Sequence, residues 1–178
     1  MLIGEKVFLT GLERSDLTAN YIWGNDREVI ALSGMNPYPK SSWQIEKWYE
    51  SSLTNSNGLL LAIRTREEKK YIGNIELTEI DVKNSCCQLG IIIGDRDFRQ
   101  QGHGLDAVNT LVDFAFGELN LHRVFARVLS YNQAAQQLFK KAGFIEEGRE
   151  REAFYCNHKY WDIVFLSRLS TDKSKGKK

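Results

Sequence analysis

The sequence predicts a mixed α/β fold in which about four helices pack on a central twisted, mainly antiparallel sheet of about seven strands. Three strand-like runs in the middle of the chain are joined by connections of only three or four residues, which can link only antiparallel neighbours. On either side of them, apolar residues recur at helical spacing between further strand-like segments. The expected order is one strand, two helices, three strands, a helix, a strand, a helix and two strands.

The bulk composition is that of one globular domain with a basic end. The 178 residues are 42% hydrophobic and 26% charged, and we expect a single domain over residues 1–170. Residues 171–178 hold four lysines and one aspartate, so the body is slightly acidic although the formal net charge is +1. We expect this tail to be disordered. An acidic body argues against a nucleic-acid partner.

The apolar and cysteine patterns favour a cytoplasmic protein. No apolar run approaches the roughly 18–20 residues of a membrane span, and the N-terminus lacks a signal-peptide pattern, so no membrane partner is expected. An odd number of cysteines, two of them adjacent, does not form a disulfide framework. The three histidines have no metal-ligand spacing with one another or with the cysteines, so no metal is expected.

The N-terminal part is predicted to contain a strand, a helix and a loop. Residues 6–12 have the pattern of a short strand, and residues 14–26 that of a helix with its N-cap at position 15 or 16. The face of this helix expected to be buried consists of Leu17, Tyr21 and Ile22. Both prolines of the chain lie in residues 33–40, which are therefore expected to form a loop.

A second helix is predicted over residues 41–53. Ser41 and Gln44 have the spacing of a capping box at its start. One face of the helix carries Ile45, Trp48, Tyr49 and Ser52. Four large aromatic residues of this region either line a binding pocket or belong to the core, and the core is expected for most of them: Trp23, Trp43, Trp48 and Tyr49.

The three central strands are expected at residues 58–66, 71–82 and 86–94. In the second of them the apolar positions change from odd to even between Leu77 and Ile80. Because side chains of a strand alternate between the two faces, this slip predicts a bulge or the end of one buried face.

The C-terminal half is predicted to alternate helices and strands. We expect a helix from Gly104, a strand at 122–130, a helix from the N-cap Asn132 to the C′ residue Gly143, and strands near 145–155 and 159–169. The first helix has an apolar stripe formed by Leu105, Val108, Val112, Ala115 and Leu119. The second is expected to direct Leu138 and Ala142 inward.

The stretch Arg-Gln-Gln-Gly-His-Gly, residues 99–104, predicts an anion site between a strand and a helix. Successive backbone N–H groups and the positive end of the helix dipole suit a diphosphate, and glycines allow its close approach. A dinucleotide fingerprint also matches, but it belongs on the first βαβ unit and needs a carboxylate about 20 residues later, which the next strand lacks. A P-loop is excluded because no Gly-Lys-Ser/Thr follows.

Residues 99–104 also resemble the R/Q-x-x-G-x-G/A signature of the GNAT acetyltransferase superfamily. The resemblance continues through "NLHRVFARVLSYNQAAQQLFKKAGF" and "GFIEEG" and covers residues 6–169. It is similar to the branch that contains ribosomal-protein alanine and spermidine N-acetyltransferases. It implies the GNAT fold, with acetyl-CoA as co-substrate. The cofactor-binding residues that it implies are Ile91, Ile92, Ile93, Arg99, Gln100, Gln101, Gly102, His103, Gly104, Leu105 and Asn132.

Within this set the resemblance implies different roles. The backbone of residues 91–93 is expected to pair with the pantetheine arm as an added strand would. Asn132 is expected to contact pantetheine as well as to cap its helix. Arg99 is suited to a charge-assisted contact with phosphate. His103 is expected to face solvent.

The sequence departs from the resembled family at the positions of general acids and bases. The tyrosine, serine and glutamate positions are occupied by Phe139, Ala135 and Gln88, none of which can serve as the usual acid or base. Tyr131 is the best substitute as a general acid, unless positioning and oxyanion donors suffice. Glu76 and Glu79 are candidates for binding the amine, although an ordinary solvated strand face would explain them as well.

The function that follows is direct transfer of acetyl from acetyl-CoA to a primary amine in a ternary complex. The expected partner is a small-molecule amine or a peptide, such as a protein N-terminus, and assembly into a homo-oligomer stays open. A spermidine or polyamine acetyltransferase is the first alternative, although residues 33–43 lack the acidic run of a polyamine pocket. A catalytically weak acyl-CoA-binding module and a dinucleotide-dependent oxidoreductase are the alternatives of other classes.

Overall fold

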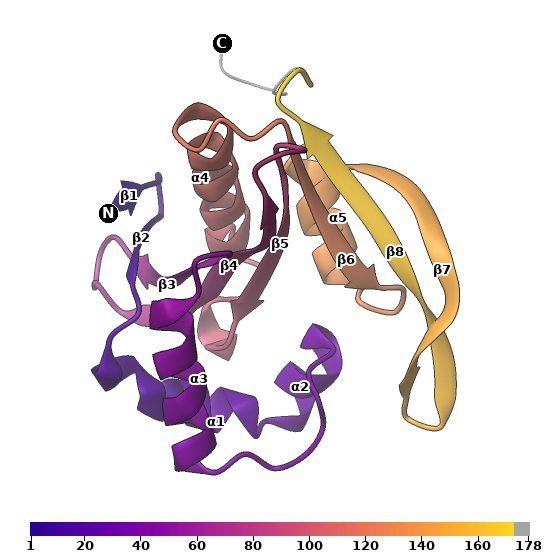
Figure 1. Ribbon diagram of the computed structural model, residues 1–178. Helices are drawn as coiled ribbons and strands as arrows, with labels where there is room; N and C mark the ends of the chain where they lie inside the picture. The colour runs from indigo at the N-terminus through magenta and orange to yellow at the C-terminus, as the bar shows by residue number, and fades with distance from the viewer. Residues whose placement is uncertain (173–178) are drawn as a thin grey trace.

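The computed structural model describes residues 1–172, and its centre is one eight-stranded sheet in the order β1-β2-β3-β4-β5-β6-β8-β7 (Figure 1). The strands are β1 (Leu2–Ile3), β2 (Val7–Gly11), β3 (Leu59–Thr65), β4 (Tyr71–Asp81), β5 (Cys86–Ile93), β6 (Arg123–Leu129), β7 (Ile145–Cys156) and β8 (Lys159–Leu169). All neighbours are antiparallel except β5 and β6. The predicted mixed, mainly antiparallel architecture is confirmed. Residues 173–178 of the predicted tail lie outside the described residues.

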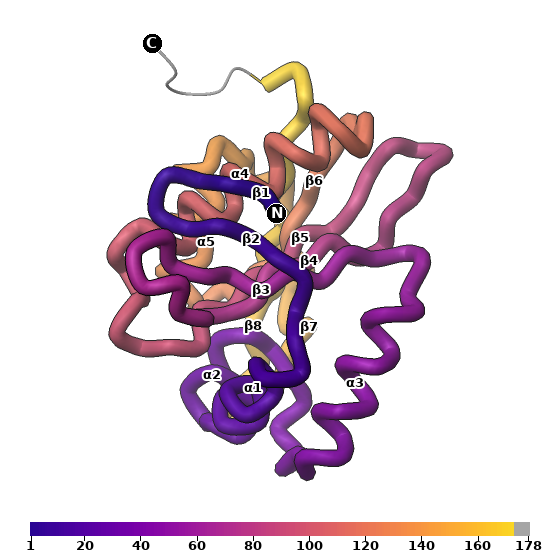
Figure 2. Tube along the Cα trace, turned by 90° about the vertical axis from the view of Figure 1, so that its left-hand side faces the viewer, coloured from indigo at the N-terminus to yellow at the C-terminus, as the bar shows by residue number. Residues whose placement is uncertain are grey.

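Five α-helices and two short 3₁₀ helices accompany the sheet in residues 1–172. They are η1 (Arg14–Asp16), α1 (Leu17–Gly24), α2 (Arg27–Ser33), α3 (Ser42–Thr54), η2 (Arg96–Phe98), α4 (His103–Gly117) and α5 (Gln133–Lys141). Figure 2 shows α3 on one side of the strands and α4 and α5 on the other. Helix α3 therefore lies on the opposite side of the sheet from α4 and α5, and α1 and α2 lie at the lower end of the strands in both views.

Helix α2 was not expected from the sequence. Its N-cap is Asp26, whose carboxylate accepts hydrogen bonds from the amides of Glu28 (2.8 Å) and Val29 (3.4 Å). It ends at Gly34. These signals are present in the sequence, but a helix of seven residues is too short to show a helical apolar period.

The predicted apolar face of α1 is found at Leu17, which packs against the core, but not at Tyr21 and Ile22. Ile22 is 59% exposed and Tyr21 is also exposed, whereas Asn20 is buried. The Asn20 side chain exchanges hydrogen bonds with two residues of the sheet, Tyr71 and Asn74. A polar network therefore replaces the expected apolar contact, because its donors and acceptors satisfy one another inside the protein.

The predicted start and inner face of α3 are partly confirmed. Ser41 Oγ accepts from the Gln44 amide and Gln44 Oε1 accepts from the Ser41 amide, which completes the capping box. Ile45 and Tyr49 are buried. The core assignment is wrong for Trp43, which is 66% exposed.

Helices α4 and α5 pack on the sheet through apolar faces. The buried residues of α4 are Gly104, Ala107, Val108, Leu111, Val112 and Ala115. Leu119 was predicted to extend this stripe, but the helix ends at Gly117 and Leu119 is exposed. In α5 Phe139 is buried, and Gly143 follows the helix with φ +86°, as expected for C′.

The predicted irregularity of β4 is a bulge. The register with β5 shifts between Thr78 and Asp81, and Glu79 has φ 51°. The odd-to-even slip in the apolar pattern is therefore explained by one extra residue in β4.

Strands β5 and β6 pair over only three residues each. Cys86, Cys87 and Gln88 lie opposite Arg123, Val124 and Phe125, and no pairing of the two strands continues beyond Gln88. The strands then diverge, as Figure 1 shows. One edge of residues 89–93 is consequently left without a neighbouring strand, although the other edge pairs with β4.

Candidate active site

A cavity of about 600 Å³ lies where β5 and β6 diverge. Its walls include residues 88–92 of β5, residues 127–129 of β6 and parts of α1, α2 and α3. Asn132, Ala135 and Phe139 close it on the α5 side. A cleft of this size is ordinary for a ligand site.

The glycine turn presents a row of unbonded amides at the start of α4. Gln100 and Gly102 have φ of 59° and 90°. Within residues 1–172, no oxygen accepts a hydrogen bond from the backbone N–H groups of residues 100–105. These groups and the N-terminal dipole of α4 form the kind of concavity that binds anions.

The two glycines of this turn serve different purposes. Gly102 is the N-cap of α4 and adopts the left-handed conformation that side chains disfavour. At Gly104 a Cβ would lie 2.9 Å from Leu138 Cδ1, so this glycine permits α4 to pack on α5. Close approach of an anion at both glycines stays a prediction.

Lys6 and Asp106 support the turn, and neither was predictable from the sequence. Lys6 Nζ donates to the Gln101 carbonyl at 2.8 Å. The Asp106 carboxylate accepts from the amides of residues 5, 6 and 7 at 2.8–3.0 Å, which holds the β1–β2 turn against α4. These pairs are separated by about 100 residues in the chain, so no local pattern reveals them.

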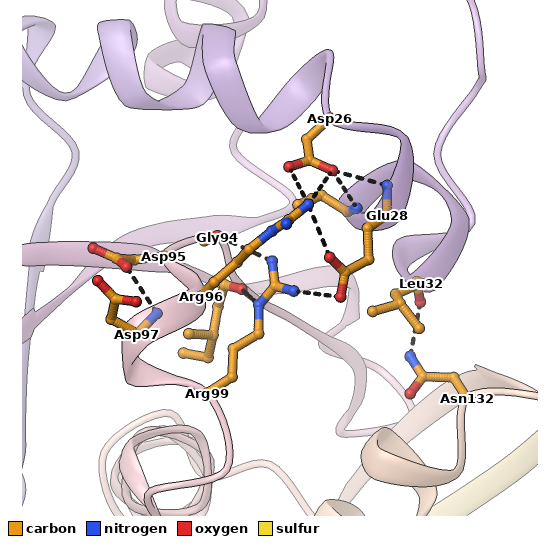
Figure 3. A network of polar contacts seen from close by, with 11 residues as sticks. Asp26, Glu28, Leu32, Gly94, Asp95, Arg96, Asp97, Arg99 and Asn132 are labelled. Carbon is orange, nitrogen blue, oxygen red and sulfur yellow. Dashed lines mark hydrogen bonds and ion pairs between the residues drawn. The ribbon is translucent and has the colours of Figure 1, made fainter.

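Arg99 binds the protein itself in this structure (Figure 3). Its Nε donates to the Ile93 carbonyl at 2.9 Å, and its Nη2 donates to the Gly94 carbonyl at 3.0 Å. Its Nη1 lies 3.0 Å from Glu28 Oε1. The guanidinium thus joins the end of β5 to α2, and its contact with a phosphate stays a prediction.

His103 is placed differently from the expectation. Its ring packs edge-on against Phe98, with 5.4 Å between ring centroids. Its Nδ1 is buried and has no hydrogen-bond partner within residues 1–172. The expected solvent-facing ring is therefore wrong.

Asn132 and Tyr131 bind the C-terminal end of α2. Asn132 Oδ1 caps α5 by accepting from the Ala135 amide at 3.0 Å, as predicted. Its Nδ2 donates to the Leu32 carbonyl at 2.8 Å (Figure 3). The Tyr131 hydroxyl donates to the Ala31 carbonyl.

Tyr131 has features that bear on its expected role as an acid. The pKa of its hydroxyl is raised, mainly by burial and to a lesser extent by the neighbouring Cys156. It is not among the residues that line the cavity. To donate a proton to a ligand, the Tyr131 hydroxyl would first have to break its hydrogen bond to the Ala31 carbonyl. Its part in proton transfer stays a prediction.

Glu76 and Gln88 place acceptor oxygens in the cavity wall. Glu76 lines the cavity, and burial raises the pKa of its carboxyl group. Within residues 1–172 the Gln88 Oε1 atom is buried without a hydrogen-bond partner. The two side chains come from neighbouring strands, Glu76 from β4 and Gln88 from β5. In the pairing of these strands, Glu76 lies opposite Gly90 and Gln88 lies opposite Thr78. They offer acceptor oxygens to a cationic or N–H-bearing ligand.

The structure does not bring Glu79 to the cavity. Glu79 is exposed at the bulge of β4 and lines no described cavity. Of the two predicted carboxylates, only Glu76 is therefore positioned to meet a ligand there. Trp23 and Trp48 also line the cavity and provide aromatic surface beside it.

No set of three or more His, Cys, Asp or Glu side chains in residues 1–172 is grouped so that it could hold a metal ion. None of the helices there combines the length and the apolar character needed to cross a membrane.

Comparison with known proteins gives a consistent result. Residues 6–145 match the model of the acetyltransferase (GNAT) domain. The chain is 29% identical to the spermidine N(1)-acetyltransferase of Vibrio cholerae, over 90% of this chain and 91% of that protein. It is 31% identical to the probable N-acetyltransferase YjcK of Bacillus subtilis, over 97% and 98% of the two chains.

A solved structure supports the same assignment. The crystal structure of the Vibrio cholerae spermidine N-acetyltransferase in complex with CoA and spermine superposes with a TM-score of 0.87 at 28% identity. The superposition covers 94% of this chain and 97% of that one. The chain described here therefore belongs to the GNAT family and is an acetyl-CoA-dependent N-acetyltransferase.

Proposed function

We propose that acetyl-CoA binds with its diphosphate on the amides of residues 100–105 and its pantetheine arm along β5. The row of unbonded amides in the glycine turn is the observation that carries this proposal. Lys6 adds a positive charge beside Gln101. The contacts of Gln100, Gln101, Gly102, His103, Gly104 and Leu105 with phosphate oxygens are mainly made by the backbone.

The pantetheine arm occupies the gap between β5 and β6. The backbone of Ile91, Ile92 and Ile93 is paired with β4 on one edge and has no strand on the other. An extended arm that bears amides adds to this free edge as a strand would. Asn132 lies across the gap on the α5 side and contacts the arm after its bond to Leu32 is exchanged.

The thioester end of acetyl-CoA then lies near Gln88 and Glu76. The neutral amine attacks the thioester carbonyl carbon, the new C–N bond forms and the C–S bond breaks. The amine nitrogen loses a proton, and the CoA thiolate gains one as it leaves. Amides of β5 stabilise the negative charge on the carbonyl oxygen during attack.

Glu76 is the residue that receives the amine. A free ammonium group with a pKa of about 10 must lose a proton before attack. A carboxylate whose pKa is raised by burial is a better proton acceptor than an exposed one. Tyr131 is the candidate donor to the departing thiolate once its hydroxyl is free of Ala31, and solvent is the alternative route.

The acceptor class is a primary amine, either a small molecule or a peptide N-terminus. A polyamine acceptor is the second candidate, favoured by the similarity to the enzyme solved with CoA and spermine and by Glu76 in the cavity. A protein that binds acyl-CoA without turnover is the alternative of another class, favoured by Phe139, Ala135 and Gln88 at the positions of the usual acids and bases.

Acetyl transfer is tested by the release of CoA thiol from acetyl-CoA in the presence of single amines. Polyamines, amino sugars and short peptides are compared, and acetylated products are identified by mass spectrometry. The proposal predicts release that depends on an amine and initial-rate plots typical of a ternary complex. Binding of CoA without acceleration by any amine class would favour the acyl-CoA-binding module instead.

Further proposals concern the extent of the domain, its location and its assembly. We propose one catalytic domain over residues 1–170 and a cytoplasmic location, the latter supported by three free cysteines in the described residues. Assembly into a homo-oligomer is supported by a similar solved enzyme, the dodecameric spermidine N-acetyltransferase from Vibrio cholerae, with a TM-score of 0.79 and 28% identity.

A further inference from the structure

A second cavity adjoins the acceptor end of the first. It measures about 160 Å³ and lies between α3 and the strands β3 and β4. Trp48, Leu60 and Glu76 line both cavities. The two cavities therefore lie side by side at Glu76, the residue proposed to receive the amine. We take the second cavity as the space for a substituent of that amine.

From this arrangement we propose that the acceptor is a primary amine with one positive charge and neutral hydrogen-bonding substituents, in place of a polyamine. The inference rests on the proposed function, because it takes Glu76 as the site of the reacting amine. An amino alcohol, an amino sugar and a neutral peptide with a free N-terminus share this chemistry.

The charges around the two cavities match an amine with a single positive charge. Among the described residues, Glu76 is the one acidic side chain that lines either cavity. Lys40 lines the larger cavity, and its Nζ donates to the carbonyls of Gly24 and Asn36, both at 3.1 Å. An acceptor with one ammonium is matched by Glu76, whereas further ammonium groups would meet Lys40 and no second carboxylate.

The polar groups of the second cavity match neutral substituents of the amine. Beyond Glu76, its polar lining is Ser51, Ser52, Asn55 and Thr78. All four are uncharged. The Ser51 and Ser52 hydroxyls donate to the carbonyls of Trp48 and Tyr49, so their oxygens keep lone pairs for a ligand. Hydroxyl or amide groups of a substrate are matched there by neutral donors and acceptors.

The energetic reason for excluding a polyamine is desolvation. Moving an ammonium group out of water without a carboxylate partner carries a large desolvation penalty. A neutral hydroxyl that finds a hydrogen-bond partner avoids this loss. Discrimination between the two substrate classes is therefore expected to exceed tenfold in kcat/KM, which corresponds to about 1.4 kcal/mol.

The test compares acceptors of matched length with the full chain and acetyl-CoA. The panel consists of an amino alcohol, glucosamine, a neutral dipeptide amide, the corresponding unsubstituted alkylamine and spermidine. We expect kcat/KM for the best monocationic polar amine to exceed that for spermidine at least tenfold. Comparison of kcat/KM for the dipeptide amide with kcat/KM for the amino alcohol and glucosamine then shows whether a peptide or a small molecule is the preferred acceptor. Equal or greater kcat/KM for spermidine would overturn the inference.

Thr78→Val tests the second cavity without a change of size. It removes one hydroxyl from the cavity wall and keeps the β-branched shape of the side chain. We expect kcat/KM to fall about threefold to tenfold for the polar amine and to stay unchanged for the alkylamine. Thr54→Val, at the end of α3 and outside both cavities, is the matched control. An equal fall for both amines in Thr78→Val would contradict a specific role of the second cavity.

Failure of this inference is distinguishable from failure of the proposed function. CoA binding is measured separately by calorimetry. If CoA binds and spermidine is the preferred acceptor, the inference is wrong and the proposed acetyl transfer stands. If CoA does not bind and no amine is acetylated, both are wrong.

Discussion

The side-chain amide of Asn132 donates a hydrogen bond of 2.8 Å to the carbonyl of Leu32, 100 positions earlier in the chain. This bond fixes the C-terminal end of α2 beside α5. At the other end of α2, Glu28 binds the guanidinium groups of Arg96 (2.9 Å) and Arg99 (3.0 Å). Helix α2 is therefore attached to both sides of the gap between β5 and β6, which Figure 3 shows at close range.

Asn132→Ala tests the double role of this side chain. It removes the N-cap of α5 and the bond to Leu32, so we expect a loss of about 1–3 kcal/mol in the free energy of unfolding. Urea unfolding measures this loss. Because Asn132 is also proposed to contact pantetheine, the affinity for CoA should fall, as measured by calorimetry.

Asn132→Asp is the matched control for the cap. A carboxylate still accepts from the Ala135 amide, but it cannot donate to Leu32 or to a pantetheine carbonyl. We expect this variant to regain part of the stability and none of the CoA affinity. CoA binding as in the wild type by both variants would contradict the assignment of Asn132.

Gly102→Ala tests the glycine turn. A side chain in the left-handed conformation at φ 90° costs about 1–2 kcal/mol, and its Cβ disturbs the amides that face the diphosphate. We expect the dissociation constant of CoA to rise about tenfold or more, measured by calorimetry. Gly117→Ala in the same helix has no atom within 4 Å of the new Cβ and should leave CoA binding unchanged. Equal binding by the two variants would argue against the turn.

Glu76→Gln separates catalysis from stability through its pH dependence. Burial raises the pKa of Glu76 in the folded protein, so the folded state holds this proton more tightly than the unfolded state. The stability that this proton contributes is present at low pH and is lost as pH rises through the folded pKa. The variant should therefore be more stable than the wild type at pH 7, and the difference should vanish near pH 4.

The activity of Glu76→Gln should change in the opposite direction. If Glu76 accepts the amine proton, kcat falls about 100-fold or more. Thermal unfolding at several pH values and initial rates measure the two effects. Glu67→Gln, at an exposed position of the β3–β4 turn, is the control. A variant that is fully active and less stable at pH 7 would rule out this account of Glu76.

Asp16 and Arg64 form an ion pair beneath the N-terminal helices, with 2.7 Å between Asp16 Oδ2 and Arg64 Nη2. The Asp16 side chain is 6% exposed, so its removal leaves a guanidinium without its partner. We expect Asp16→Ala to lower the free energy of unfolding by about 3–5 kcal/mol. Glu50→Ala breaks the exposed Lys47–Glu50 pair and should cost less than about 1 kcal/mol. Similar losses of unfolding free energy in the two variants would contradict the expectation that the buried ion pair matters more for stability than the exposed one.

Features that depend on neighbouring residues were predictable from the sequence. The capping box at Ser41, the cap at Asn132 and the bulge after Leu77 follow from local spacing, and each is found in the structure. The family signature in residues 99–104 located the turn before α4 in the same way.

Features that depend on distant residues were not predictable. The Arg99 guanidinium binds the Glu28 carboxylate, 71 positions away in the chain. Lys6 donates a hydrogen bond to the Gln101 carbonyl, 95 positions away. The exposure of Ile22 follows from the bonds of Asn20 to β4, which no helical period reveals. The acceptor end of the cavity needed the structure because its walls come from α1, α3, β4 and β5 together.

The central claim is that the amides of residues 100–105 bind the diphosphate of CoA. Titration of ¹⁵N-labelled protein with CoA, followed by the backbone amide resonances, tests it most directly. The account predicts that the largest saturable shifts occur at residues 100–105, accompanied by shifts at residues 91–93. Saturable shifts confined to other parts of the protein, with residues 100–105 unchanged, would contradict it.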